Sequence, residues 1–255
     1  MIFTEETAKS YEDWLHTPVG RYIDGREKEL ILALAMPRDG ERLLDVGCGT
    51  GEHLFLFREK GCDVTGLEPS PFMLEIARQK LGNRAAFHVG KAEDLPFSDN
   101  EFDIVTLITS LEFIDDPEKA ISEAIRVSRN RVLIGVLNKY SLIGVQRRLK
   151  LFRPSVYHSA RFFHIAELIT MVRNQLHDVH IKWGSVVFLP YGCHKFAGAM
   201  EESIPVMKNP FGAFIGLSFP VTFMYRTVQD IIGEPFKIKT ESRYSMREVV
   251  KGMKE

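Results

Sequence analysis

The sequence predicts an α/β protein whose mostly parallel sheet carries helices on both faces. From Arg42 onward, short apolar runs alternate with longer segments of helical periodicity, as in a parallel sheet built from strand and helix units. The first strand runs into a glycine-rich turn and then a helix, and two later helices begin with a capping residue followed by proline. The chain of 255 residues is long enough for one large domain or two small ones.

The expected elements follow in order along the chain. Residues Thr4–Met36 are expected to form helices packed on the edge of the sheet, and Pro37–Gly40 should form the turn into the first strand. Helices should then start near Glu52, Pro71 and Pro117. The five expected strands of this region are Arg42–Gly47, Asp63–Glu68, Ala85–Val89, Asp103–Thr109 and Arg131–Leu137.

After Leu137 the alternation becomes less regular. A helix is expected over Ile165–Gln175, and apolar strands are expected near Val179–Leu189 and Gly212–Phe219. About twenty residues separate these two strands, with a short helix expected around Phe196–Glu202, so a tight hairpin is not predicted.

Composition and charge exclude several classes of protein. The formal net charge is −1, which gives no global reason to expect a nucleic-acid-binding protein. Three cysteines without a Cys-x-x-Cys pair favour neither a disulfide framework nor a zinc site, and they fit a reducing cytoplasm. His158 and His164 lack partners at metal-ligand spacing, so no metal is expected. The N-terminal ten residues do not resemble a secretory signal, and the longest charge-free stretch, Asn209–Tyr225, is too short to span a membrane.

The strongest motif is the glycine-rich turn in Leu43–Glu52, which reads LLDVGCGTGE. A dinucleotide loop of the form Gly-x-Gly-x-x-Gly would need glycine where Glu52 stands. The carboxylates of Asp45 and Glu52 flank the turn and would repel a pyrophosphate, whereas they favour a ligand with a positive centre, such as the methionine end of S-adenosylmethionine. Glu68 ends the next strand, where a carboxylate can accept both hydroxyls of a ribose, a feature shared by NAD and S-adenosylmethionine.

These residues resemble the class I S-adenosylmethionine-dependent methyltransferases of the small-molecule type (methyltransferase type 11), whose pattern LDVGCGTG stands at 44–51. The likeness continues through GLEPSPFML at 66–74, AEDLPF at 92–97, Phe102-Asp103 and EFIDDP at 112–117. It covers residues 41–137 closely. Weaker likeness extends to ARFF at 160–163 and FGAF at 211–214.

The resemblance implies a fold and a division of the chain. The fold would be a doubly wound, mostly parallel seven-stranded sheet of the Rossmann-like methyltransferase type, with a helical lid. Residues 1–40 would be N-terminal helices covering the cofactor site, and 41–137 the cofactor-binding core. Residues 138–164 would form a basic amphipathic lid insertion, 165–221 a helix and antiparallel strands completing the sheet, and 222–255 a C-terminal extension whose role stays open.

The resemblance also implies the cofactor, S-adenosylmethionine, with S-adenosylhomocysteine as its product. By position, residues of the glycine turn would line the methionine portion, and Glu68 would hold the ribose diol. Met73 would pack on the adenine, and the backbone amide of Ala92, next to Glu93, would bind the adenine edge. The full set assigned to the cofactor is Asp45, Gly47, Cys48, Gly49, Gly51, His53, Glu68, Pro69, Met73, Ala92, Glu93 and Thr109.

Two positions depart from the family pattern. Lys91 stands where the family usually has an aspartate that receives the adenine amine, so Glu93 or a backbone carbonyl would have to substitute. The family's Pro-Gly-Gly turn before the fifth strand is replaced by Ser128-Arg129-Asn130-Arg131, which we interpret as a detail of the fold.

Two residues are candidates for a role in the reaction. Glu112, just after the fourth strand, would face the methyl group as a catalytic or acceptor-orienting residue, and Tyr11 would belong to a segment that folds over the cofactor. Solvated loop and packing roles are the alternatives. Methyl transfer needs mainly positioning, and a general base matters only where the acceptor must lose a proton.

The acceptor is expected to be a small molecule, acidic or lipophilic. Between Glu123 and Glu167 the chain has no acidic residue but nine Lys or Arg residues. Within this run, 140–153 reads as a basic amphipathic helix that could contact the acceptor or an anionic membrane surface. The atom methylated and the oligomeric state stay open.

Two other classes of function are considered. The chain could bind S-adenosylmethionine as a regulatory or scaffold protein without catalysis, because an intact loop indicates binding but not turnover. It could also be a nicotinamide-dependent oxidoreductase, which the glycine spacing and Glu52 oppose.

Overall fold

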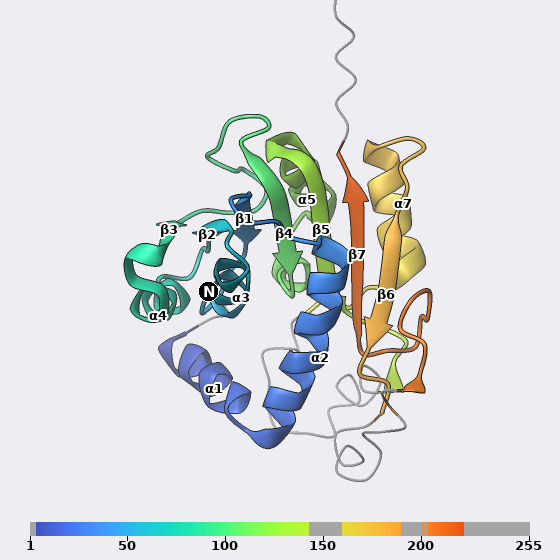
Figure 1. The fold of residues 1–255 in the computed structure, drawn as a ribbon, viewed down its shortest axis with the longest axis horizontal. Coiled ribbons are helices and arrows are strands. Elements are labelled where there is room, and N and C mark those ends of the chain that lie inside the picture. The colour runs from blue at the N-terminus through green and yellow to red at the C-terminus, as the bar shows by residue number, and fades with distance from the viewer. Residues whose placement is uncertain (1–3, 143–159, 190–200, 202, 222–255) are drawn as a thin grey trace, which may run out of the picture. The chain divides into compact units, whose positions relative to one another are not determined.

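A computed structural model describes residues 4–142, 160–189, 201 and 203–221 (Figure 1). Within these residues, a seven-stranded sheet has the order β3-β2-β1-β4-β5-β7-β6. Neighbours among β1 to β5 are parallel, whereas β7 runs antiparallel to both β5 and β6. The mostly parallel seven-stranded sheet is therefore confirmed. The strands are β1 (Arg42–Val46), β2 (Asp63–Leu67), β3 (Ala85–His88), β4 (Phe102–Ile108), β5 (Ser128–Leu137), β6 (Lys182–Val186) and β7 (Phe214–Pro220).

Helices cover both faces of the sheet, as the sequence predicts. On one face, α2 (Pro18–Ala35), α3 (Glu52–Glu59) and α4 (Pro71–Leu81) supply Leu and Ile side chains to one buried cluster. On the other face, α5 (Pro117–Val127) and α7 (Ile165–Gln175) contribute to a second cluster. The apolar stripe of each helix thus accounts for the near-continuous burial of β4 and β5 between the two layers.

The N-terminal segment forms two capped helices. Thr4 caps α1 (Glu5–Leu15) by accepting a hydrogen bond from the amide of Thr7, and Thr17 caps α2 through the amide of Gly20. In Figure 1, α1 lies on the side toward which the parallel strand β4 points, which is the carboxyl edge of the parallel strands. The expectation that this segment is helical is confirmed, and its role as a cover for the cofactor stays a prediction.

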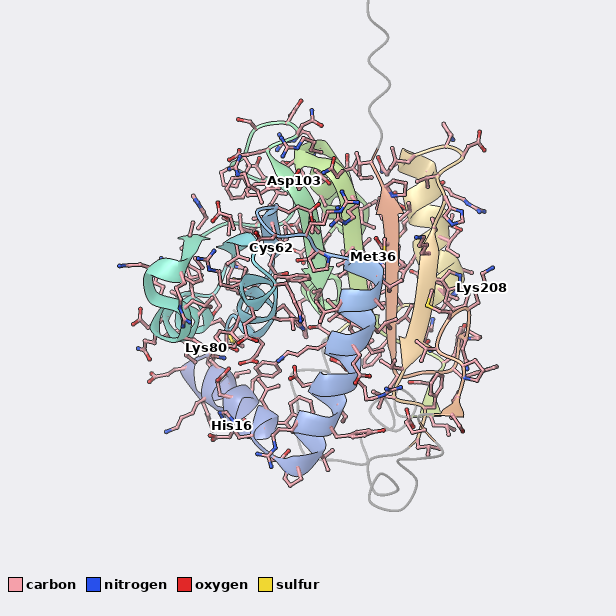
Figure 2. The ribbon with its side chains drawn as sticks, in the orientation of Figure 1. His16, Met36, Cys62, Lys80, Asp103 and Lys208 are labelled. Atoms are coloured by element: carbon pink, nitrogen blue, oxygen red, sulfur yellow. The ribbon has the colours of Figure 1, made fainter. Side chains whose placement is uncertain are left out.

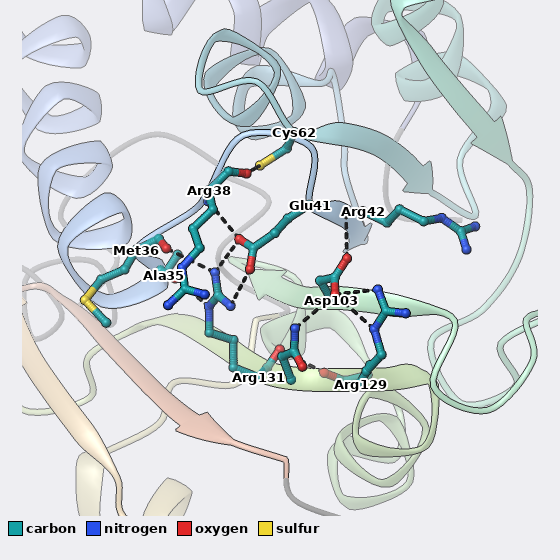
Figure 3. A network of polar contacts seen from close by, with 11 residues as sticks. Ala35, Met36, Arg38, Glu41, Arg42, Cys62, Asp103, Arg129 and Arg131 are labelled. Atoms are coloured by element: carbon teal, nitrogen blue, oxygen red, sulfur yellow. Dashed lines mark hydrogen bonds and ion pairs between the residues drawn. The ribbon is translucent and has the colours of Figure 1, made fainter.

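Strand β5 begins three residues earlier than the expected start at Arg131. Ser128 pairs with Phe102, and the register then shifts before Ile104 pairs with Arg131. Polar side chains hold this irregular start, because Arg129 Nε and Asn130 Nδ2 donate to one oxygen of Asp103 at 3.0 and 2.9 Å (Figure 3). A polar strand start held by side chains gives no apolar alternation, so the pattern did not reveal it. β6 is also shorter than the expected strand over Val179–Leu189.

The connection between β3 and β4 contains no α-helix and crosses the face covered by α5. Glu123 in α5 accepts a hydrogen bond from the amide of Leu95 at 2.9 Å, and Arg126 donates to the Leu95 carbonyl at 3.0 Å. Leu95 and Ala92 are buried in the same cluster as Leu67. These contacts hold the segment that was expected to reach the adenine.

Several expectations concern residues outside the described part. The basic amphipathic helix expected over 140–153, the short helix around 196–202 and the extension 222–255 lie wholly or mostly outside the described residues, so the helical lid is not confirmed. The five-part division of the chain stays a prediction. Among the helices that the structure describes, none has the length and apolar character needed to cross a membrane.

Candidate cofactor and acceptor site

The glycine turn joins β1 to α3 through three left-handed residues. Gly47, Gly49 and Gly51 have φ values of +76°, +53° and +86°, which residues with a Cβ rarely adopt. A Cβ on Gly47 would lie 2.5 Å from the Cβ of Ser110, and one on Gly51 would lie 2.8 Å from Leu81. A Cβ on Gly49 would meet no atom within 4 Å. Gly47 and Gly51 thus fit the turn into its surroundings, whereas Gly49 borders open space.

The backbone amides of this turn are largely used within the protein. Gly47 and Cys48 both donate to the carbonyl of Leu67, at 2.7 and 3.1 Å, and Gly49 donates to Oε2 of Glu68 at 3.1 Å. The amide of Gly51 donates to the carbonyl of Cys48 at 3.0 Å. A pyrophosphate site presents unpaired amides to its ligand. The arrangement therefore speaks against a dinucleotide loop.

The charge of Glu52 is balanced by two lysines rather than directed at a ligand. Lys28 Nζ of α2 lies 3.0 Å from Oε2 of Glu52, and Lys80 of α4 pairs with the other oxygen. Burial acts to raise the pKa of Glu52, but the two ion pairs outweigh it and the pKa is lowered. The expectation that Glu52 repels a phosphate is therefore wrong, because Lys28 and Lys80 balance its charge. The loop is unsuited to a pyrophosphate because its amides are already bonded within the protein.

Lys80 also joins α1 to this cluster. Its Nζ lies 3.0 Å from Oε1 of Glu12, so a single ammonium group connects α4, the start of α3 and α1 (Figure 2). Lys28 in turn pairs with Asp24 at 2.6 Å. We call these five residues, Glu12, Asp24, Lys28, Glu52 and Lys80, the lysine cluster.

Asp45 lies at the end of β1 with an incompletely satisfied carboxyl group. Its Oδ1 accepts a hydrogen bond from Thr106 Oγ1 at 2.7 Å, while its buried Oδ2 has no partner among the described residues. Burial raises the pKa of Asp45 to about 7, against the hydrogen bond from Thr106, and the charge of Glu68 adds to the rise. Buried hydroxyl oxygens of Thr50 and Ser110 likewise have no partner in the described part. Buried polar atoms of this kind usually have a partner, so these three indicate a ligand.

Glu68 is buried just after β2 and faces the same turn. Its two carboxylate oxygens accept hydrogen bonds from the amides of Ser70 at 2.9 Å and Gly49 at 3.1 Å. Burial raises its pKa, against these two hydrogen bonds. Each carboxylate oxygen can accept more than one hydrogen bond, so the group can still receive the hydroxyls of a ribose.

The next predicted contacts flank this carboxylate. His53 is buried in the first turn of α3, where burial lowers its pKa to about 4, so the imidazole is neutral. Met73 is buried in the first turn of α4, and Pro69 just before that helix is exposed. Burial raises the pKa of Cys48, with the charges of Asp45 and Glu68 adding to it, so this thiol stays protonated.

The adenine segment follows β3 at the same edge. Ala92 is buried, Lys91 is exposed, and Oε1 of the half-buried Glu93 accepts a 3.5 Å hydrogen bond from the amide of Asp116. One carboxylate oxygen of Glu93 thus already accepts a long hydrogen bond from the N-cap residue of α5. Its role toward the adenine amine stays a prediction.

Ser110, just after β4, was not predicted from the sequence, but the structure places it against the glycine turn. Thr109 was predicted to contact the cofactor, but its hydroxyl donates to the carbonyl of Ile108 at 2.8 Å. Ser110, the next residue, packs against Gly47, and its hydroxyl has no hydrogen-bond partner among the described residues. The left-handed backbone of Thr109 (φ +49°) precedes this arrangement, and a left-handed β-branched residue is not foreseeable from periodicity.

The two candidates for the reaction occupy structured positions. Glu112 is buried in the short turn η2 (Leu111–Phe113), where its Oε1 accepts a hydrogen bond from the amide of Leu137 at 2.6 Å. Its carbonyl accepts from the amide of Arg161 at 2.9 Å. Tyr11 in α1 is half-buried and stacks on Trp14 with ring centroids 6.2 Å apart. Glu112 therefore joins the ends of β4 and β5, and the catalytic roles of both residues stay predictions.

Comparison with known proteins decides the family. Residues 44–134 match a family model described as a methyltransferase domain. Over 186 residues, the chain is 32% identical to an uncharacterized protein of Methanocaldococcus jannaschii, covering 72% of this chain and 84% of that protein. A crystal structure of an S-adenosylmethionine-dependent methyltransferase from Thermotoga maritima is 27% identical, with a TM-score of 0.67 and coverage of 87% of this chain and 98% of that one. The chain belongs to the S-adenosylmethionine-dependent methyltransferases.

Another relative of this methyltransferase matches less than half of the chain. The demethylmenaquinone methyltransferase of Renibacterium salmoninarum is 35% identical over 104 residues. The match spans 41% of the present chain and 44% of that protein. The shared part therefore supports the fold and the cofactor rather than the acceptor.

The methyltransferase uses S-adenosylmethionine, and its site fits this cofactor. Buried oxygens of Asp45, Thr50 and Ser110, which have no hydrogen-bond partner in the described part of the chain, lie around the turn, and a Cβ on Gly49 would meet no atom within 4 Å. Glu68 offers acceptors for a ribose diol one strand away. In the part of the chain that is described, no group of three or more His, Cys, Asp or Glu side chains is arranged to hold a metal.

Proposed function

We propose that this methyltransferase acts on a small lipophilic acceptor that enters beside the carboxyl ends of β4 and β5. The observation that carries the proposal is a set of exposed apolar side chains there: Tyr140, Leu142 and Phe211 are 61%, 62% and 68% exposed. We call these three residues the apolar patch. Large exposed apolar side chains grouped at one place favour an interaction with an apolar partner.

The buried side-chain amide of Asn138 holds the two segments of the apolar patch together, one with Tyr140 and Leu142 and the other with Phe211. Asn138 follows β5, and its Nδ2 donates to the carbonyls of Pro210 and Gly212, each at 2.7 Å. Its Oδ1 accepts a hydrogen bond from the amide of Tyr140 at 3.1 Å. Because β7 runs antiparallel to β5, with Leu137 opposite Phe214, the segment before β7 lies at the carboxyl edge of β5.

The patch adjoins the candidate acceptor-orienting residue. The amide of Lys139 donates to the carbonyl of Phe163 at 2.7 Å, and Glu112 binds the amide of Leu137. Lys139 and Arg161 add positive charge to this edge, although Arg161 is paired with Glu167 at 2.5 Å. An apolar surface with cationic side chains supports a lipophilic acceptor that also carries a polar or acidic group.

The residues have distinct tasks in the proposed reaction. When bound, the cofactor would supply a methyl group carried on a cationic sulfur: a bond would form between the acceptor atom and the methyl carbon while the carbon–sulfur bond breaks, and S-adenosylhomocysteine would leave as a neutral thioether. The protein's part is to orient both molecules and exclude water, which is worth up to about 7 to 11 kcal/mol for well-positioned reactants. We propose that Glu112 orients the acceptor and that Tyr11 closes over the cofactor.

The acceptor can be sought directly. The purified full-length protein is incubated with isotope-labelled S-adenosylmethionine and either the organic-soluble or the aqueous fraction of a cell extract. We expect mass spectrometry to find a labelled product in the organic-soluble fraction. A Glu68→Ala variant should give no product, and Glu75→Ala, which removes an exposed carboxylate from α4, should behave as wild type. Product only in the aqueous fraction would contradict a lipophilic acceptor, and no product in either would favour the non-catalytic alternative.

Variants at the patch test its role once an acceptor is known. Phe211→Ser and Tyr140→Ser should raise KM for the acceptor several-fold while leaving the affinity for S-adenosylhomocysteine unchanged. Met36→Ser removes an exposed apolar side chain at the end of α2 and is the matched control. Glu112→Gln and Tyr11→Phe should each lower turnover, and unchanged kinetics in both would remove their proposed roles.

A further inference from the structure

Ser110 follows β4, at the point in the sheet where the order of the strands reverses between β1 and β4. Strand β1 adjoins β2 on one side and β4 on the other, so the carboxyl ends of β1 and β4 flank a crossover. Ligands of parallel α/β sheets bind at this kind of position. A Cβ on Gly47 would lie 2.5 Å from the Cβ of Ser110 and 3.3 Å from its Oγ, so the serine side chain directly contacts the glycine turn.

The hydroxyl of Ser110 is buried and forms no hydrogen bond with the residues that the structure describes. The residue is 8% exposed, and its Oγ forms no hydrogen bond within the described ranges 4–142, 160–189 and 203–221. Other buried serines differ in this respect, since Ser128 Oγ donates to the carbonyl of Arg131 at 2.9 Å. An unpaired buried hydroxyl is unfavourable unless a ligand satisfies it.

The backbone before Ser110 is held in an unusual conformation. Thr109 has a φ of +49°, which is rare for a β-branched residue. Its amide donates to the carbonyl of Gly135 at 2.8 Å, and its hydroxyl donates to the carbonyl of Ile108 at 2.8 Å. Two hydrogen bonds therefore hold a strained residue that sets the direction of Ser110. Strain of this kind is concentrated at functional positions.

The order of the strands indicates which part of a ligand would meet this hydroxyl. The adenine segment follows β3, Glu68 follows β2, and the glycine turn follows β1. Adenine, ribose and thioether of the cofactor have the same order as these three strands. The next strand in the sheet is β4, where the remaining amino-acid end of the cofactor would reach Ser110.

We propose that the Ser110 hydroxyl is a cofactor-positioning group that binds the amino-acid end of S-adenosylmethionine. This inference rests on the cofactor assignment. The unpaired Oδ2 of Asp45 is an acceptor suited to the ammonium group, and a serine hydroxyl can donate to the carboxylate. Together, the two residues match the zwitterion with one acceptor and one donor. Such binding fixes the sulfur relative to the acceptor without any contact to the methyl group.

Calorimetric titration of the full-length protein with two ligands tests the inference. S-adenosylhomocysteine has the amino-acid end, whereas 5′-methylthioadenosine keeps the adenosine and thioether but lacks it. We expect Ser110→Ala to weaken binding of S-adenosylhomocysteine about ten-fold and to leave binding of 5′-methylthioadenosine within about two-fold of wild type. The ligand-free variant should unfold at the same temperature as wild type or higher, because it loses an unpaired buried hydroxyl.

The control and the contrary outcomes are distinct. Ser128→Ala removes a buried serine hydroxyl at the opposite end of the sheet and should bind both ligands as wild type does. Equal weakening of both ligands by Ser110→Ala, or of neither, would overturn the proposal. A fall in turnover with both affinities unchanged would assign Ser110 to the acceptor instead and would also overturn it. If wild-type protein bound neither ligand, the cofactor assignment itself would fail, and the inference with it.

Discussion

The guanidinium group of Arg131 in β5 forms two hydrogen bonds with the carboxylate of Glu41, at 2.9 and 2.6 Å (Figure 3). The same guanidinium donates to the carbonyls of Ala35 and Met36, at 2.6 and 3.1 Å. These carbonyls belong to the last turn and the cap of α2, where a positive charge is favourable. One side chain thus joins the end of α2, the approach to β1 and the centre of the sheet.

We predict that Arg131→Met lowers the free energy of unfolding by about 2 to 4 kcal/mol, because the largely buried carboxylate of Glu41 loses its cationic partner and keeps only the amide of Arg38 as a donor, and because two helix carbonyls lose the guanidinium. Chemical denaturation monitored by circular dichroism measures the change. Arg38→Met, at an exposed position of the neighbouring turn, should change stability by less than about 0.5 kcal/mol. Similar losses of unfolding free energy in both variants would show that the contacts of Arg131 stabilise the fold no more than an exposed side chain does.

The glycines of the turn should separate folding from cofactor binding. Gly47→Ala places a Cβ against Ser110 and should destabilise the protein by about 2 kcal/mol or more. Gly49→Ala meets no atom and should cost only about 1 kcal/mol for its left-handed backbone, yet reduce affinity for S-adenosylhomocysteine about ten-fold. Gly40→Ala, left-handed and open at the other end of β1, is the matched control and should bind normally. Normal binding by Gly49→Ala would contradict the placement of the cofactor.

Removal of Lys80 from the lysine cluster should loosen α1. We expect Lys80→Met to raise the rate of amide hydrogen exchange in α1 several-fold, because Glu12 loses its partner on α4. Exchange in α5, on the opposite face of the sheet, should not change. Lys9→Met, an exposed substitution within α1 itself, should leave exchange as in wild type. Unchanged exchange in α1 after loss of Lys80 would show that apolar packing alone holds this helix.

Asp45 should make the ligand-free protein less stable as pH rises. With its pKa raised to about 7, the folded protein retains a proton that the unfolded chain releases above its ordinary value of 3.8. Between these pH values the unfolded state binds fewer protons, so stability falls with rising pH, by at most about 1.4 kcal/mol per unit. The difference in unfolding free energy between wild type and Asp45→Asn, measured from pH 4 to 7, should therefore decline. Parallel curves would contradict this.

Sequence reasoning predicted the elements well because their signals are local. The pairs Ser70-Pro71 and Asp116-Pro117 mark the starts of α4 and α5 to the residue, since capping and proline act within one turn. The glycine turn was likewise predicted from its own residues, Leu43–Glu52.

What sequence reasoning missed depends on distant partners. The charge of Glu52 was misjudged because its two lysines stand 24 and 28 residues away. Ser110 was not named because its contact with Gly47, in the turn after β1, joins residues 63 positions apart in the chain. The start of β5 was misplaced because side chains around Asp103 hold it. No periodic pattern records such pairings.

The position of β7 has a consequence for synthesis of the chain. Because β7 lies between β5 and β6, the parallel half of the sheet ends in an open edge at β5 until residues 214–220 have been made. That edge is apolar, with Val132, Ile134 and Val136 among its residues, and open apolar edges promote aggregation. A nascent chain that stalls after β6 would therefore depend on a chaperone or a second chain to shield β5, whereas one released after β7 would not.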